Sequence, residues 1–406
     1  MKRCKRFFVV LLCILLALQV VGCENNQNEQ KEEYAIKLNN AYDGATVDLC
    51  SNLVREYLNA TEESKQIELL NRHAGQNAAF QTLSFSWEGD GVSQNYSVYF
   101  SDNEAFEDSI VYETTDTHIS MIGCFVPGTT YYWKVVGDAE GSTSAVDTFT
   151  TLDAPVRYIS TLNIPNVRDM GGWETEDGKR VKYELVYRGG KTNPSSGNKC
   201  TPEDEELFAE KLGIRTEIDL RTQNADDGNQ TSSVFGFNVR YYKTTLTQFC
   251  YIYPEFEQTE PFQRSYDSRS KQSIQQIFEV LGNENNYPIY FHCNAGADRT
   301  ATVAFLINGL LGVSYEDLTK DYELTTFSTS GSRWRSSVTD GKFDSSGVFR
   351  DDEGNYVAWG KMYDMMMQNY GTGDGKLSSA IENYLKTVCN VEQETIDSVR
   401  KIMLED

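Results

Sequence analysis

The sequence is poor in the residues that metal-binding, redox and nucleic-acid-binding proteins depend on. It has three histidines, and its nine cysteines include no Cys-x-x-Cys pair and no metal-ligand spacing, so a zinc site is not expected. Nine cysteines in 406 residues are also too sparse for a disulfide scaffold. Lys and Arg number 37 against 60 Asp and Glu, a net charge of −23. Because phosphate backbones bind to basic faces, the sequence excludes nucleic acid as a partner.

Long apolar runs are equally scarce, and the clearest one stands at the N-terminus. A basic stretch at residues 2–6 precedes an apolar run at 7–18, and Gly22 stands directly before Cys23, an arrangement typical of a secretion signal. The segment resembles a bacterial lipoprotein signal. That resemblance implies that residues 1–22 are removed, that Cys23 is lipidated, and that the chain is anchored to the membrane on the extracytoplasmic side. An uncleaved membrane anchor is the alternative.

The remaining chain is long enough for two domains, with 39% hydrophobic and 24% charged residues. Residues 23–37 lack apolar periodicity and are predicted to form a polar tether. Residues 38–152 contain alternating runs such as "QTLSFSW", "NYSVYF" and "TYYWKV", which predict an all-β immunoglobulin-like sandwich. The stretch "FVPGTTYYWKV" resembles the fibronectin type III pattern, in which Tyr131 would form a tyrosine corner. Residues 49–70 have helical spacing and are expected to be an insertion or a lead-in helix.

Residues 153–406 have a different rhythm. Strand-like runs such as "RTEIDL" and "PIYFHC" alternate with helical runs such as "PEDEELFAEKL" and "TATVAFLINGLL", which predicts an α/β domain with a parallel or mixed sheet. In such a fold a ligand site is expected beyond the carboxyl ends of the strands.

The stretch "YFHCNAGADRTATVAFLI", residues 290–307, has the features of such a site. It is interpreted as a buried strand, a tight loop with Gly296, and an apolar helix. A loop that enters a helix N-terminus directs several backbone amides at one anion. A cysteine there, Cys293, is expected to lose its proton readily, and Arg299 has the planar fork that suits phosphate oxygens.

The segment "HCNAGADRT" resembles the phosphate-binding signature of the cysteine-dependent tyrosine phosphatases, and most closely the bacterial tyrosine/lipid phosphatases with an HC-x-AGKDRT loop. The segments "NVRDMGG", "YRGGK", "DLRT" and "LLGVSYEDLTKDYELT" follow the order of that family, so the resemblance covers residues 155–406. It implies a phosphotyrosine-phosphatase-like fold and a metal-independent reaction without cofactors.

The resemblance also implies roles for the loop residues. Cys293 would be the nucleophile that forms a phosphocysteine, and Asp298 would be the general acid. An N-cap role for Asp298 is the alternative, with Asp219 as the next candidate acid. The phosphoryl oxygens would be bound by Arg299 and the loop residues Asn294, Ala295, Gly296 and Ala297.

Six residues are expected to support the site. His292 would orient the loop, and Thr300 would bond the thiolate or simply start the helix. The other four would buttress the site or supply charge, or else form ordinary ion pairs. They are Arg168, Asp169, Asp219 and Arg221, with Arg188 as an alternative to Arg221.

The loop departs from the family pattern at two positions: Ala297 replaces a lysine and Ala301 a glycine. The missing cation argues against multiply charged substrates. The sequence therefore predicts a membrane-tethered phosphatase for phosphate monoesters, with phosphotyrosine in a protein or a small ester as substrate. The alternatives are a phosphoinositide or inositol phosphate phosphatase on the same site, a catalytically silent binding protein, and a thiol redox or sulfur-transfer protein. Residues 327–360 are interpreted as a lid or as a long loop.

Overall fold

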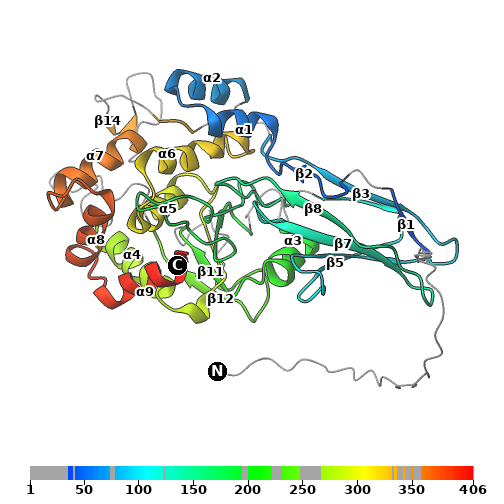
Figure 1. The fold of residues 1–406 in the computed structure, drawn as a ribbon. Helices are drawn as coiled ribbons and strands as arrows, with labels where there is room; N and C mark the ends of the chain where they lie inside the picture. Colours follow the sequence, from blue (N-terminus) through cyan, green and yellow to red (C-terminus); the bar gives the residue numbers. More distant parts are fainter. Residues whose placement is uncertain are drawn as a thin grey trace, which may run out of the picture.

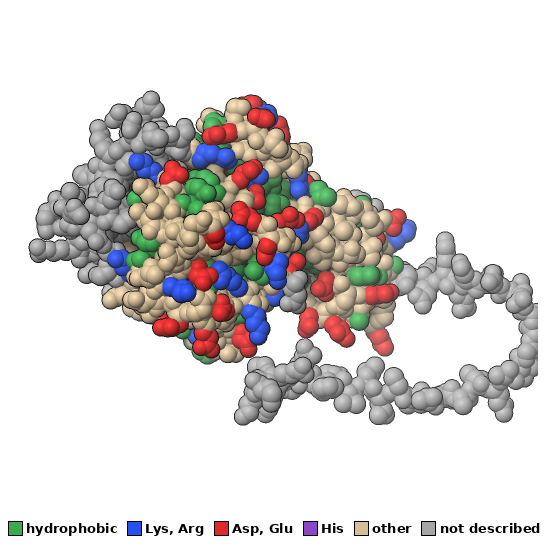
Figure 2. Space-filling model, turned by 60° about the vertical axis from the view of Figure 1, so that its left-hand side comes forward, with side chains coloured by type: hydrophobic (Ala, Val, Ile, Leu, Met, Phe, Trp, Pro, Cys, Tyr) green, Lys and Arg blue, Asp and Glu red, His purple; other side chains and the backbone are tan. Residues whose placement is uncertain are grey.

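The computed structural model describes residues 35–39, 42–73, 78–121, 125–193, 200–221, 230–246, 267–331, 333–335, 342–343, 349–350 and 358–405. The predicted signal segment, Cys23 and nearly all of the tether lie outside these residues. Within them, no helix is both long and apolar enough to cross a membrane. Figure 1 shows a β-rich part on one side and a part rich in helices on the other. Acidic and basic side chains are interspersed over the face in Figure 2.

The β-rich part consists of two sheets that share an aromatic core. One sheet has three strands in the order β1-β3-β6, and the other has five strands in the order β2-β8-β7-β4-β5. Their bounds are β1 Lys37–Leu38, β2 Thr46–Val47, β3 Leu83–Glu88, β4 Tyr96–Ser101, β5 Ile110–Thr114, β6 His118–Met121, β7 Thr130–Gly137 and β8 Asp147–Thr151. Because side chains alternate along a strand, Phe85 faces inward, and its ring lies 4.8 Å from Phe100 and 5.0 Å from Trp133.

Tyr131 on β7 has the contact predicted for a tyrosine corner. Its hydroxyl accepts a 2.9 Å hydrogen bond from the backbone amide of Val126, a few residues upstream. The ring is buried and packs on Phe125 and Phe149. The contact ties the start of β7 to the loop before it. Kinship with fibronectin type III domains remains a prediction.

The helical structure expected within residues 49–70 is present as two helices, and their buried side chains lie in the core of the C-terminal part. They are α1, Asn52–Asn59, and α2, Glu63–His73. The side chain of Ser51 caps α1 by accepting a hydrogen bond from the Val54 amide. Val54, Tyr57 and two leucines of α2 lie in the same apolar core as the helices of the C-terminal part, and Figure 1 places α1 and α2 beside α6. The β-rich part and the C-terminal part have separate apolar cores, and α1 and α2 contribute to the C-terminal core although they precede residue 153.

The C-terminal part is built on a five-stranded sheet of order β12-β11-β13-β10-β9. Four strands run parallel, and the edge strand β9 is antiparallel to β10. In the parallel register, Gly189 and Asp219 both pair with His292, so three strands end at the same level. The bounds are β9 Arg168–Asp169, β10 Val186–Gly189, β11 Thr216–Asp219, β12 Arg240–Lys243 and β13 Ile289–His292.

Helix α5 lies at the centre of this part, with every residue from Thr300 to Leu311 buried. It ends at Gly312, whose φ of 95° suits glycine. A side chain at Gly309 would meet Ile381 at 2.5 Å, so glycine there allows α8 to pack closely. The surrounding helices are α3 Pro202–Glu206, α4 Asp267–Leu281, α6 Tyr315–Glu323, α7 Ala358–Tyr370, α8 Leu377–Thr387 and α9 Gln393–Met403. Shorter elements are η1 Leu207–Lys211, η4 Glu284–Asn286, η5 Leu324–Phe327, β14 Lys342–Phe343 and β15 Phe349–Arg350.

Candidate active site

The predicted loop lies at the carboxyl edge of the parallel sheet. It connects the end of β13 at His292 to the start of α5 at Asp298. Because β13 is flanked by two parallel strands, the loop emerges where the ends of neighbouring strands converge. Cys293, the first loop residue, is 3% exposed. The loop therefore lies beyond the carboxyl ends of the strands, where a ligand site was expected.

Gly296 allows the loop to close against the end of β10. Its φ is +67°, a left-handed conformation. A Cβ at this position would lie 2.4 Å from the backbone carbon of Gly189. Neither the conformation nor the close approach tolerates a side chain, so the loop depends on glycine here.

The backbone amides of the loop are available to an anion. In the described part of the chain, no amide from Asn294 to Thr300 donates a hydrogen bond. The loop carbonyls instead accept hydrogen bonds from other segments. The carbonyl of Asn294 accepts a 3.1 Å bond from the Lys191 amide, and the carbonyl of Ala295 accepts a 2.7 Å bond from the Ser330 hydroxyl. With the carbonyls engaged by other segments and α5 starting here, the loop has the properties of an anion cradle.

Arg299 supplies a cation to this cradle. It is half-buried, and its guanidinium makes no ion pair or hydrogen bond with any residue that the structure describes. A partly buried, unpaired guanidinium suits two oxygens of a tetrahedral oxyanion. The predicted role of Arg299 in substrate binding agrees with this geometry.

A buried polar network holds the loop from the other side. The Asn166 side-chain amide donates to the carbonyl of Gly296 at 2.9 Å, and Arg188 donates to the same oxygen at 3.1 Å. Arg168 donates to the Asn166 side-chain oxygen at 2.6 Å and to the Asp321 carboxylate at 2.8 Å. Arg188 pairs with the other oxygen of Asp321. The network links the loop to β9, β10 and α6, so the supporting roles predicted for Arg168 and Arg188 are consistent with the structure.

Two buried arginines, Arg168 and Arg188, share the carboxylate of Asp321 in this network. Burial would raise the pKa of Asp321, but Arg168 and Arg188 outweigh it and hold the pKa below its usual range. Burial and the nearby Arg168 lower the pKa of Arg188 to about 10, against the opposing effects of Asp321 and Cys293.

Asp169 binds residues outside the loop. Its carboxylate pairs with Arg157 at 3.3 Å and accepts hydrogen bonds from the amides of Gly171 and Glu184. Burial raises its pKa to about 6, while Arg157 opposes the shift. Among the described residues no hydrogen bond or ion pair joins it to the loop, so direct support of the loop by Asp169 is not observed.

His292 is placed to orient the loop, as predicted. Its Nε2 lies 2.9 Å from the Glu217 carboxylate, and its Nδ1 lies 3.3 Å from the Cys293 carbonyl. Thr192 and Gln230 donate to the same Glu217 oxygen at 3.1 and 3.2 Å. Because these residues are buried, the network fixes the ring at the entrance to the loop.

Asp219, the second candidate for the general acid, is held in its ionised form. Its carboxylate is bound by Arg221 at 2.7 and 2.9 Å, by Lys243 at 2.8 Å and by Tyr241 at 2.8 Å. Burial would raise its pKa, but His292, Arg221 and Lys243 together hold the pKa well below its usual range. The interpretation of Asp219 as proton donor is therefore not supported, and Arg221 serves as its ion-pair partner.

Asp298 contacts a segment distant in the sequence. Both carboxylate oxygens accept hydrogen bonds from Arg333, at 2.8 and 3.0 Å. The N-cap role is not observed, because Ala297 occupies the cap position and makes no side-chain cap bond. The Thr300 hydroxyl is buried and has no partner in the described part of the chain, which leaves it available to a group in the cradle.

Four residues of the site were not predicted as such: Asn166, Glu217, Asp321 and Arg333. Asn166 and Asp321 lie within segments that matched the family pattern, which was the available signal. Glu217 lies in the predicted strand "RTEIDL", where a buried charge is unusual. Arg333 belongs to the segment interpreted as a lid or loop. The first residues of that segment contact the cradle, and most of the rest lies outside the described residues.

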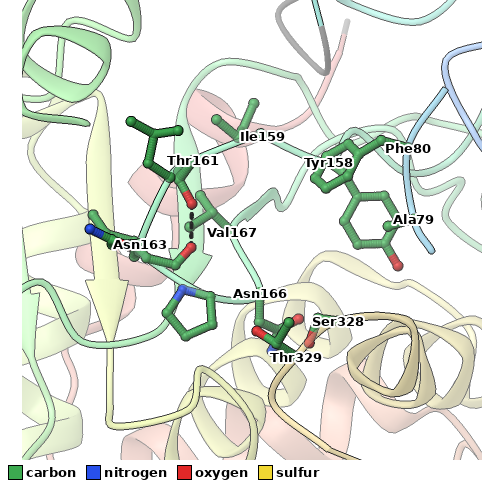
Figure 3. A pocket seen from close by; sticks show the side chains of 13 residues that line it. Ala79, Phe80, Tyr158, Ile159, Thr161, Asn163, Asn166, Val167, Ser328 and Thr329 are labelled. Atoms are coloured by element: carbon green, nitrogen blue, oxygen red, sulfur yellow. Dashed lines mark hydrogen bonds between the residues drawn. The ribbon is translucent and has the colours of Figure 1, made fainter. Parts of the chain in front are cut away.

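A cavity of about 290 Å³ adjoins the site. Figure 3 shows Asn166, Ser328 and Thr329 on one side, with Tyr158 and Phe80 across from them. Because Asn166 also bonds the Gly296 carbonyl, one side chain connects the cavity to the loop. Within the described residues, no cluster of three or more His, Cys, Asp or Glu side chains is arranged to hold a metal ion.

A largely parallel sheet, covered by helices and followed by an anion-binding loop that begins with a cysteine, is typical of cysteine-dependent phosphatase-like folds. The comparison with protein families agrees: residues 159–405 match the model of the tyrosine phosphatase family. The chain belongs to that family.

Individual relatives are distant. A tyrosine-protein phosphatase homologue of Cupriavidus necator is 23% identical over 172 residues, covering 39% of this chain and 59% of its own length. A tyrosine-protein phosphatase of Nostoc commune is 26% identical over 137 residues, covering 31% and 45%. The chain thus spans about half the length of the curated relatives it matches. Among solved structures, the catalytic core of the PP-IP phosphatase SIW14 of S. cerevisiae matches with a TM-score of 0.25 and 19% identity, over 36% of this chain and 73% of that one.

Proposed function

We propose that the protein is a cysteine-dependent phosphatase that hydrolyses phosphate monoesters, with phosphotyrosine the favoured substrate. One observation carries the proposal: buried Cys293 lies at the start of a loop whose amides are free, whose carbonyls are engaged elsewhere, and whose arginine has no partner among the described residues. Such a cradle stabilises the charge on a phosphoryl group as it is transferred.

The reaction follows from this geometry. The Cys293 thiolate attacks phosphorus, and the bond to the ester oxygen breaks as the leaving group takes a proton from Asp298. Water then attacks the phosphocysteine and gives a proton to the Asp298 carboxylate, which releases inorganic phosphate and restores both the thiolate and the acid. Arg299 and the loop amides bind the phosphoryl oxygens throughout, and the buried Thr300 hydroxyl is available to the sulfur. In its acid form, Asp298 donates its proton from one oxygen while the other stays in contact with Arg333.

Inositol phosphates are a second candidate substrate class, and Arg333 favours them. The absence of a lysine at position 297 removes a cation from the loop itself. Arg333 brings a cation to the adjacent Asp298 from another segment, so the deficit inferred from the loop sequence is partly offset. A second anionic group on the substrate would be attracted to such a cation.

Two further proposals concern the location of the protein and the role of the β-rich part. The N-terminal pattern supports lipidation of Cys23 and anchoring of the chain on the extracytoplasmic face of a membrane. The two-sheet arrangement and the Tyr131 contact support a fibronectin type III-like module that acts as a spacer or docking unit.

The experiment that tests the function uses purified residues 24–406 in the presence of a chelator. Phosphate release is measured from phosphotyrosine and phosphoserine peptides, phosphoinositides and inositol hexakisphosphate, with Cys293→Ser as control. Release confined to phosphotyrosine would support the main proposal, and a preference for inositol phosphates would support the second. Release by neither protein would favour a silent binding protein, and sulfur transfer from thiosulfate without phosphate release would favour the thiol alternative.

A further inference from the structure

Arg333 and Asp298 form an ion pair that joins two distant segments at the cradle. The guanidinium bonds both carboxylate oxygens, and the two side chains are only 17% and 13% exposed. The backbone of Arg333 is fixed as well by the hydroxyl of Thr326. This hydroxyl donates a 2.6 Å hydrogen bond to the Arg333 carbonyl and accepts a 2.8 Å hydrogen bond from the Arg333 amide. The pair is thus part of an ordered arrangement.

The same segment is attached to the helices inserted in the N-terminal part. Arg335 binds the fully buried Glu323 through its amide and guanidinium, at 2.6 to 3.0 Å. Tyr57 on α1 donates to that carboxylate at 2.6 Å, and Gln66 on α2 accepts from Arg335 at 2.7 Å.

Apolar and backbone contacts reinforce this attachment. The Tyr57 ring lies 5.4 Å from the ring of Phe327. The Ala78 amide, which follows α2, donates to the Phe327 carbonyl at 2.9 Å. Phe327 ends η5, directly before Ser328, Thr329 and Ser330, and the Ser330 hydroxyl bonds the loop carbonyl of Ala295. A continuous series of contacts therefore runs from α1 and α2 to the cradle.

We propose that Arg333 is a positioning residue for the proton donor Asp298, and that the α1–α2 hairpin holds Arg333 in place. The inference rests on the proposed phosphatase function. It makes the N-terminal part of the chain a component of the active site and not only a spacer. The chain order explains how this arises: the hairpin is inserted between β2 and β3 but shares the core of the catalytic part.

The ion pair has a consequence for proton donation. A guanidinium in bidentate contact fixes both oxygens of a carboxyl group, and a proton donor must lie within hydrogen-bond reach of the leaving oxygen. Both oxygens of Asp298 are held by Arg333 in this way. Loss of the Arg333 contact is therefore expected to weaken proton donation to the leaving group more than the attack by Cys293.

The test measures kcat in the full mature chain, with a phenyl phosphate of poor leaving ability and a dinitrophenyl phosphate of good leaving ability. With the poor leaving group, Arg333→Gln is expected to lower kcat by about tenfold to a hundredfold, and Arg333→Lys by less. With the good leaving group, both losses are expected to be much smaller. Tyr57→Phe is expected to cause a smaller loss with the poor leaving group. The matched control is Arg400→Gln, which removes a comparable pair with Glu382 between α8 and α9 and is expected to cause no loss.

Each other outcome has a definite meaning. Wild-type kcat values for Arg333→Gln would overturn the positioning role while leaving the phosphatase function intact. Wild-type kcat values for Tyr57→Phe, even with a lower melting temperature, would overturn the role of the hairpin. Equal losses with both leaving groups would also overturn the proposal, because a good leaving group needs little proton donation. No phosphate release by the wild type would overturn the proposed function, and this inference with it.

Discussion

The side chain of Asn166 donates a 2.9 Å hydrogen bond to the carbonyl of Gly296, a residue 130 positions further along the chain. Asn166 has a φ of +60°, which is uncommon outside glycine but is tolerated by asparagine. The bond holds a loop carbonyl away from the face that the free amides line. The anion cradle thus depends on a residue that contributes nothing to the reaction itself.

Replacement of Gly296 by Ala should disrupt the loop. The added Cβ would lie 2.4 Å from the Gly189 backbone carbon at a φ of +67°, so the loop must shift. We expect loss of phosphate release and a free energy of unfolding lower by at least about 1 kcal/mol. Activity assays and urea unfolding measure the two effects.

The matched control is Gly178→Ala. Gly178 also has a positive φ, of +82°, but no atom lies within 4 Å of the position that an added Cβ would take. Its backbone strain should lower stability without reducing activity. Equal activity in both variants would show that the close approach at Gly296 is not required.

Replacement of Asp321 by Asn should be among the most destabilising polar substitutions. It removes the negative charge shared by Arg168 and Arg188, which are fully buried. Leaving buried charges without a counter-ion costs about 3–5 kcal/mol. Urea unfolding should show a large loss for Asp321→Asn and less than about 1 kcal/mol for Asp317→Asn, whose pair with Lys320 is partly exposed.

The Asp219 carboxylate should make stability depend on pH. Its pKa is lower in the folded chain than in the unfolded chain, so it contributes stability above about pH 4, and this contribution is lost as the pH falls further. At pH 7, Asp219→Asn should therefore lower the free energy of unfolding by about 3–5 kcal/mol, and the difference from wild type should shrink below pH 4.

Asp153→Asn provides the comparison for that measurement. Asp153 pairs with Arg180, but its side chain is 54% exposed, so the expected effect is less than about 1 kcal/mol at any pH. A difference for Asp219→Asn that stays constant from pH 7 to pH 3 would contradict the linkage argument.

Replacement of Asp298 by Asn should act on the leaving group. We expect a loss of about 10²–10⁴-fold in kcat for esters with poor leaving groups and a much smaller loss for good ones. Rates for a series of aryl phosphates provide the measurement. Equal losses across the series would assign proton donation to a different residue.

The loop between β13 and α5 could be predicted from sequence because its determinants are contiguous. A buried strand, a cysteine, a glycine in a left-handed conformation, an arginine and an apolar helix follow one another within residues 290–307. Local geometry alone then requires that the amides converge on one point. The placement of Cys293, Arg299 and His292 followed from that stretch.

The assignment of Asp219 could not be decided from sequence. Its spacing identifies a carboxylate at the end of a strand, but not that Lys243 and Tyr241 reach it from the neighbouring strand. Strand register decides those contacts. For the same reason Glu217, the partner of His292, was not identified: it faces His292 only when β11 and β13 lie side by side.

The sequence by itself determined the strand-loop-helix unit and the places of Cys293 and Arg299 on it, because those features depend on residues close together in the chain. Only the tertiary structure decided what surrounds that unit. Asn166 and Arg188 reach the loop from β9, β10 and the segment before them, Asp321 joins them from α6, and Arg333 reaches Asp298 from beyond η5. The tertiary structure also decided that α1 and α2 pack against the C-terminal part, where Tyr57 binds Glu323. Such contacts depend on how distant elements pack, and no spacing along the chain encodes them.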